Sequence, residues 1–251
     1  KADEIPGLPQ MDKYLLARTR KLIASVTEHM DNFEISDACD EVADFIDMLT
    51  NWYIRNTRDR FWNEDENAFN TLYTVLEAFM RVLAPLAPME AEAVWRGLTG
   101  ADSVHLGDWP YLVDPQTGAD TELGKVLVAD GALVEAMDKV REIVSSTLSL
   151  RKAHKMRVRQ PLAKLTVVVD EPSQVDVYDA LLKSELNIKA IDYSTLDAAA
   201  EHGLKIIDEL KVNARAAGPR LGKQVQFALK ASKSGNWHAD PVTGAPVIET
   251  P

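Results

Sequence analysis

Three arginines and four aromatic residues gather within the twelve positions of Asn51–Trp62. Arg55 and Arg58 are three residues apart, so on a helix they share a face, and Asn51 lies on nearly the same face as Arg55. Such an array can bind an anion while the aromatic rings anchor it to a core. A buried aromatic helix end whose arginines pair with neighbouring carboxylates would show the same spacing. The pattern alone therefore fits both a binding role and a structural one.

Charge is distributed unevenly along the chain, which has a formal net charge of −11. Residues 1–140 contain 12 Lys and Arg against 26 Asp and Glu, whereas residues 141–251 contain 16 against 13. Two stretches, Arg151–Lys164 and Lys211–Lys233, each hold six basic residues and no acidic one. Phosphate binding requires local stripes of this kind rather than a positive total. Two solvated basic faces would produce the same pattern.

The composition is that of a soluble globular protein, with 46% hydrophobic and 27% charged residues. A chain of 251 residues can form one large domain or two ordinary ones. No apolar run is long enough to span a bilayer, and the first residues do not form a signal peptide. We therefore expect a cytoplasmic protein that makes no contact with a membrane. Because the chain does not begin with Met, we also expect it to be a piece of a longer one.

Cysteine and histidine give no sign of metal or nucleophilic chemistry. Cys39 is the single cysteine, which rules out an intrachain disulfide and a zinc site with several cysteines. It falls near the apolar side of its expected helix, so we expect a small buried side chain there. The five histidines are scattered along the chain. The sequence therefore predicts no metal site and no catalytic residue.

Apolar residues at helical spacing predict an antiparallel helical bundle in the first part of the chain. After Gln160–Pro161 the period changes, and β-branched runs alternate with short helices. The expected fold is α+β, with a helical domain over 1–159 and a small α/β domain over 160–251. The expected helices cover 11–30, 35–58, 72–83, 89–98, 129–154, 175–183 and 220–230, and the expected strands cover 165–169, 186–193 and 204–212. A hairpin is expected in the tail.

The order of several motifs resembles the isoleucyl-tRNA synthetase family over roughly residues 8–230. The central motif of that family, Asn-x-Tyr-Ile-Arg-x-x-Arg-x-Arg-Phe-Trp, matches Asn51–Trp62. Arg151–Leu162 is the most isoleucyl-like piece. Further matches are Asp12–Leu16, Ala84–Pro88, Ser103–Leu106, Asp108–Pro110, Glu185–Lys189 and Gly218–Lys223. Lys230–Ser234 is similar to an active-site signature of class I synthetases, but the partner signature His-Ile-Gly-His is absent from this sequence.

The resemblance implies the anticodon-binding and C-terminal region of such an enzyme, without catalytic residues of its own. It places ATP, magnesium, the isoleucine pocket and the editing domain in a catalytic body that precedes this stretch. Many members of the family end in a cysteine-rich zinc module, from which this chain departs because it has one cysteine. The implied partners are that catalytic body and the anticodon stem-loop of tRNA(Ile).

The implied RNA contacts are basic side chains for phosphates and one aromatic ring for an unstacked base. Trp62 is either that stacking surface or part of the core. Two alternatives stay open at this point: the same region of a valyl or leucyl enzyme, and an acidic helical scaffold that binds protein through the surface around Asp37–Asp47. The candidate tRNA contacts are Arg55, Arg58, Trp62, Arg151, Lys152, Lys155, Arg157, Arg159, Arg220 and Lys223.

Overall fold

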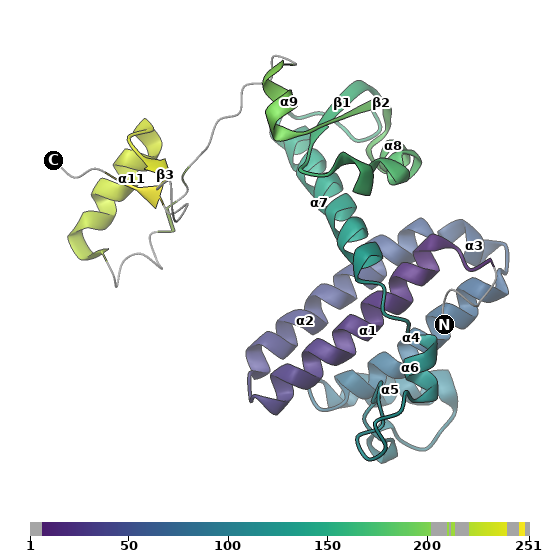
Figure 1. Ribbon diagram of the computed structural model, residues 1–251. Coiled ribbons are helices and arrows are strands. Elements are labelled where there is room, and N and C mark those ends of the chain that lie inside the picture. The colour runs from purple at the N-terminus through teal and green to yellow at the C-terminus, as the bar shows by residue number, and fades with distance from the viewer. Residues whose placement is uncertain (1–6, 202–209, 211, 214–220, 240–245, 249–251) are drawn as a thin grey trace. The chain divides into compact units, whose positions relative to one another are not determined.

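Helix α1 (Gln10–Asp31) is the centre of a helical bundle in the protein, seen here in a computed structural model. It contacts α2 (Ile35–Asp47), α4 (Glu66–Leu83) and α7 (Gly131–Ala153), and Figure 1 shows α1 and α2 lying side by side. Apolar side chains at helical spacing form its buried face. The structure describes residues 7–201, 210, 212–213, 221–239 and 246–248. The buried apolar residues of α1 are Tyr14, Leu15, Leu16, Ala17, Leu22, Ile23 and Val26.

Local signals set the ends of the bundle helices. The Asp65 carboxylate accepts hydrogen bonds from the first backbone N–H groups of α4, and Asp130 caps α7 in the same way. Pro88 occupies the first turn of α5 (Pro88–Thr99), where a missing N–H costs nothing, and Gly100 ends α5 in the left-handed conformation. The expected bundle helices are confirmed, with boundaries shifted by a few residues.

The chain from 48 to 62 is less regular than the single helix expected over 35–58. Met48–Ile54 is a π-helix, η2, in direct continuation of α2. The helix then turns at Thr57, and α3 (Arg58–Trp62) follows. Since π-helical turns are rare and often occur at functional sites, this irregularity draws attention to the same motif that the residue types had singled out.

The connection between α5 and α7 has structure of its own. It contains the 3₁₀ turn η3 (Val104–Leu106) and the short helix α6 (Glu122–Val126). Trp109 ties it to α1, because its indole N–H donates to the Thr27 hydroxyl over 3.0 Å. Arg20 of α1 donates to two backbone carbonyls on either side of the end of α6.

The later part of the chain combines strands and short helices. Strands β1 (Leu162–Val168) and β2 (Ile188–Ser194) are parallel, with α8 (Asp179–Leu186) in the crossover between them. A second pair of strands, β3 (His238–Ala239) and β4 (Pro246–Val247), is antiparallel and confirms the hairpin in the tail. The other elements are η4 (Pro172–Gln174), η5 (Asp176–Tyr178), α9 (Leu196–Glu201), η6 (Gly222–Gln224) and α11 (Val225–Ser234). The α+β class is confirmed, whereas most of the strand expected at 204–212 lies outside the described residues.

Two compact units make up the chain, and their limits differ from the expected boundary at Gln160–Pro161. One unit comprises Lys1–Leu165 with Ser173–Ile191, and the other comprises Thr166–Pro172 with Asp192–Pro251. Helix α8 belongs to the first unit because it packs against α7. The division into 1–159 and 160–251 stays a prediction. Among the described helices, none has the length and apolarity needed to cross a membrane.

Cys39 corrects one expectation about the core. Its side chain is exposed rather than buried. Helix α2 buries Ala38, Val42 and Phe45, and each residue along an α-helix turns by about 100°. Cys39 is therefore rotated off the buried face that its neighbour Ala38 occupies.

Candidate nucleic-acid interface

The inner side of the Asn51–Trp62 motif is an anchor built around a buried carboxylate. Asp12, on the first turn of α1, has an exposed fraction of 0%. Arg60 binds it through both terminal nitrogens, over 2.7 and 2.8 Å, and the Tyr53 hydroxyl donates to it over 2.8 Å. Arg60 also donates to Asp65 over 2.8 Å. The structural role considered for this motif is therefore real for Arg60 and Tyr53.

Burial and the nearby Asp12 carboxylate both raise the pKa of Tyr53. The phenol consequently stays a neutral hydrogen-bond donor over the whole physiological range. Bonds to Asp12 and Asp65 likewise raise the pKa of Arg60. Neither Tyr53 nor Arg60 therefore changes its charge near neutral pH.

The outer side of the same motif presents the three residues expected to contact RNA. Arg58 is exposed, and the exposed fraction of Trp62 is 75%. The alternative that Trp62 packs in the core is therefore wrong. The Arg55 side chain is half exposed and forms an ion pair with Glu185 of α8. The motif combines an anchored inner side with a polar, partly aromatic outer side.

The basic run at the end of α7 is likewise divided between one buried residue and several exposed ones. Lys152, Lys155, Arg157 and Arg159 are exposed, and none of them forms an ion pair with another described residue. Each is thus able to meet an anion from solvent. We call these four residues, which lie at the end of α7 and in the turn that follows, the basic loop.

Arg151 occupies a different position from the one we expected. Only 2% of it is exposed, and its terminal nitrogens donate to the backbone carbonyls of Arg157, Gln160, Leu186 and Asn187, over 2.7 to 3.3 Å. A buried guanidinium whose terminal nitrogens are held in this way cannot also reach a phosphate on the surface. We therefore leave Arg151 out of the proposed contacts. Its signal in the sequence was misleading because basic residues at a helix end look alike.

Asn187 holds the same loop from the other side. It caps α8 in the left-handed conformation, with φ 50° and ψ 56°. Its side-chain amide donates to the carbonyls of Val158 and Arg159, over 3.2 and 3.0 Å. Arg151 and Asn187 together bind the carbonyl of every residue from 157 to 160. The carbonyl oxygens of this stretch thus accept hydrogen bonds from the interior side, while its basic side chains remain exposed.

Two of the expected contacts cannot be placed. Arg220 lies outside the described residues, and Lys223 falls in η6 with only its backbone described. Both stay predictions.

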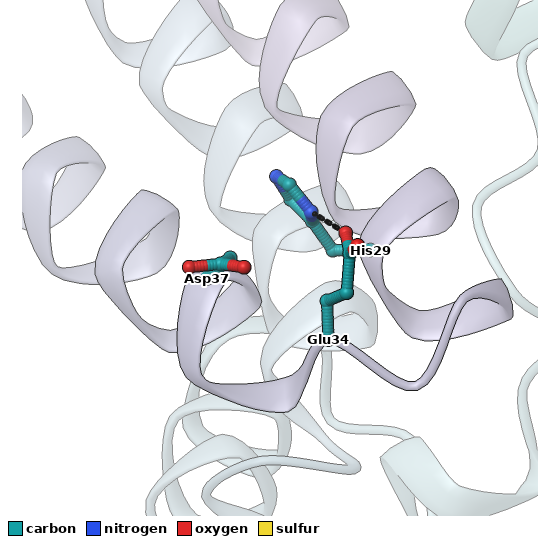
Figure 2. A group of neighbouring side chains, drawn as sticks. All are labelled: His29, Glu34 and Asp37. Carbon is teal, nitrogen blue, oxygen red and sulfur yellow. Dashed lines mark hydrogen bonds and ion pairs between the residues drawn. The ribbon is translucent and has the colours of Figure 1, made fainter.

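One group of side chains that sequence reasoning missed has the composition of a metal site. His29, Glu34 and Asp37 each offer a ligand atom, and these atoms lie within 4.8 Å of one another (Figure 2). The cluster spans the turn between α1 and α2, so no spacing within one helix reveals it. The Nδ1 atom of His29 lies 2.8 Å from a Glu34 oxygen, and this hydrogen bond raises the pKa of His29. An ion pair accounts for the arrangement.

That ion pair predicts a pH-dependent contribution to stability. The raised pKa of His29 means that the ion pair stabilises the fold fully below the pKa of this histidine in the unfolded chain, about 6.5. This contribution is lost as pH rises through the pKa of His29 in the folded protein. Replacing Glu34→Gln should therefore lower the free energy of unfolding at about pH 5.5 and have a smaller effect at about pH 8.5. Urea unfolding at both pH values checks this. In the His29→Asn background, Glu34→Gln should show no such pH dependence. An equal loss at both pH values for Glu34→Gln in the native chain would contradict the ion pair.

A helical bundle that presents an anchored aromatic motif and an internally supported basic loop has the features of a helical RNA-binding domain. Residues 12–168 match the family described as the anticodon-binding domain of tRNA ligase. The chain belongs to this family.

Comparison with curated proteins narrows the resemblance to ligases of one specificity. The chain is 73% identical over 251 residues to the isoleucine–tRNA ligase of Bifidobacterium longum, with all of this chain and 23% of that protein aligned. It is 46% identical over 237 residues to the isoleucine–tRNA ligase of Nocardia farcinica, which aligns 94% of this chain and 21% of that protein. For the isoleucine–tRNA ligase of Mycobacterium tuberculosis the identity is 43% over 244 residues, which cover 96% of this chain and 22% of that protein. The chain thus spans less than a quarter of the length of these relatives.

Proposed function

We propose that this chain is the anticodon-binding and C-terminal part of an isoleucine–tRNA ligase, and that it binds the anticodon stem-loop of tRNA(Ile). The observation that carries the proposal is the basic loop, whose backbone is held from within while its cations face solvent, at the end of the segment that matches the anticodon-binding family. The similarity to isoleucine–tRNA ligases supports the choice of tRNA.

Recognition in this proposal divides between charge and stacking. Lys152, Lys155, Arg157 and Arg159 contact phosphates, together with Arg55 and Arg58. Anticodon bases are unpaired, so they can leave the stack and lie on an aromatic face, for which exposed Trp62 is the candidate.

Catalysis in this proposal belongs to the rest of a longer, cytoplasmic ligase. Its catalytic body binds ATP and magnesium and joins isoleucine to the tRNA, while the present chain orients that tRNA. Purified alone, this chain should support no isoleucine-dependent exchange between ATP and pyrophosphate. Exchange above the level of a blank preparation would contradict this division of labour.

The experiment that tests the proposal measures binding of the chain to labelled tRNA(Ile), to tRNA(Val) and to tRNA(Ile) with a changed anticodon, each at low and high salt. We expect tRNA(Ile) to bind most tightly, and its affinity to fall steeply with salt because bound phosphates release counterions. Equal affinity for all three RNAs would overturn anticodon recognition. Absence of RNA binding would instead favour a protein partner for the acidic surface around Asp37–Asp47.

Replacing Trp62→Ala should weaken binding of tRNA(Ile) with little change in protein stability. Stacking of one base on an aromatic ring contributes about 1–3 kcal/mol, whereas a ring that is 75% exposed contributes little to the core. Fluorescence anisotropy with the anticodon stem-loop measures the loss. Trp62→Phe should restore most of the affinity, and Tyr111→Ala, an exposed aromatic residue elsewhere, should leave it unchanged. Equal binding by Trp62→Ala and the native chain would exclude stacking.

A further inference from the structure

We propose that the short segment Glu185–Asn187 positions both groups of RNA contacts, with Glu185 holding Arg55 and Asn187, together with Arg151, holding the basic loop. This inference rests on the proposed function, because it concerns how the RNA-binding residues are placed. In this proposal Glu185, Asn187 and Arg151 do not contact the RNA. They are positioning residues that act through their neighbours.

Glu185 fixes one edge of the Arg55 guanidinium. The Glu185 side chain is only 14% exposed, whereas that of Arg55 is 50% exposed, and the ion pair is made through one terminal nitrogen of Arg55. A guanidinium carries five N–H donors in a rigid plane. With one edge held by a largely covered carboxylate, the remaining donors keep a defined orientation toward solvent. An arginine held in this way loses less side-chain freedom when a phosphate binds.

Two residues further on, the chain grips the basic loop. The Asn187 amide binds two carbonyls of that loop, and the carbonyls of Leu186 and Asn187 accept from the buried Arg151, which binds two more. Asn187 also accepts from the backbone N–H of Leu162, where β1 begins. The loop is thereby tied to the end of α8, and α8 carries Glu185. The two groups of contacts, more than ninety residues apart in sequence, are linked through three consecutive residues.

A preformed arrangement has a measurable consequence for binding. Ordering a loop and its side chains upon binding lowers affinity, and each long side chain that must be immobilised adds to this loss. Positioning residues therefore raise affinity without changing how many phosphates are neutralised. Since the salt dependence of binding reports that number, their removal should lower the affinity and leave the salt slope unchanged.

Asn187→Gly tests the grip on the loop. Glycine adopts the left-handed conformation readily, so the backbone at 187 is kept and only the side-chain amide is lost. We expect tRNA(Ile) affinity to fall about tenfold, with an unchanged slope of log affinity against log salt. Without RNA, trypsin should cut after Lys155, Arg157 and Arg159 faster than in the native chain, with cleavage at Lys125 as the internal reference. An unchanged rate of loop cleavage would show that the Asn187 amide does not hold the basic loop in place, whatever the RNA result.

Glu185→Gln tests whether Glu185 positions Arg55. A pure charge effect and a loss of positioning predict opposite changes in RNA affinity. Removing a negative charge beside an RNA site should tighten binding if only charge matters. Loss of the hold should weaken binding and reduce the preference for tRNA(Ile). Asp59→Asn is the matched control, because exposed Asp59 lies beside Arg58 and its removal changes the charge equally. Weaker binding by Glu185→Gln but not by Asp59→Asn supports the proposal, and equal or tighter binding overturns it. If the native chain binds no tRNA, the proposed function itself fails, while the cleavage result still decides the grip on the loop.

Discussion

Asp12→Asn should lower the free energy of unfolding by about 3 kcal/mol, the largest effect on stability that we expect from a single polar substitution here. The Asp12 carboxylate is fully buried and accepts two bonds from Arg60 and one from Tyr53. An amide has one oxygen where the carboxylate has two, and it carries no charge. Asn at this position therefore leaves the Arg60 fork half satisfied and poorly compensated.

Urea unfolding of the native chain and of the Asp12→Asn variant measures this loss of stability. Asp59→Asn is the control for removal of an acidic side chain, because Asp59 is exposed and its replacement should change stability by less than about 0.5 kcal/mol. A loss below about 1 kcal/mol for Asp12→Asn would show that Asp65, the other partner of Arg60, compensates on its own. The same variant should bind RNA less well, since Arg60 anchors the helix on which Arg58 and Trp62 lie.

Replacing Lys155, Arg157 and Arg159 together by glutamine should produce the largest loss of RNA affinity. If each cation neutralises one phosphate, the slope of log affinity against log salt should become shallower by about 2 to 3. Affinity for tRNA(Ile) should fall by about a hundredfold or more at low salt. The fold should persist because all three side chains are exposed.

A triple variant with the same change in net charge serves as the control. Lys21, Arg96 and Lys125 are exposed and lie on other elements of the bundle, so their replacement by glutamine removes three charges at a distance from the basic loop in sequence. We expect a change in salt slope well below 1 for this control. Equal slopes for the two triple variants would mean that total charge, rather than the basic loop, determines RNA binding.

Features governed by local spacing were predictable from the sequence. Apolar residues at helical intervals identified α1 and α7, and Ala84–Pro88 ended a helix where proline requires it. Strands β1 and β2 followed from β-branched runs separated by a short helix. In each of these cases the determining residues lie within about two helical turns of one another.

Features governed by distant partners were not predictable. The partners of buried Arg151 include Leu186 and Asn187, about 35 residues away, and Arg60 pairs with Asp12 at a separation of 48. A basic residue destined for burial carries the same letter as one destined for solvent. One signal was available for the anchor, because Asp12 is an acidic residue on the apolar side of α1, three residues before Leu15. A buried acidic side chain requires a partner that pairs with it or donates hydrogen bonds to it.

The π-helix Met48–Ile54 makes this part of the chain a spacer of fixed length. On one side, α2 is held against α1; on the other, Arg60 is held by Asp12. Each residue added or removed between them rotates one side relative to the other, because every residue of a helix advances it by a fixed angle. Substitutions within the spacer preserve this angle, but an insertion or deletion does not. Chimeric domains joined here should therefore tolerate changes at the exposed positions Thr50 and Asn51 and lose their fold with changes of length.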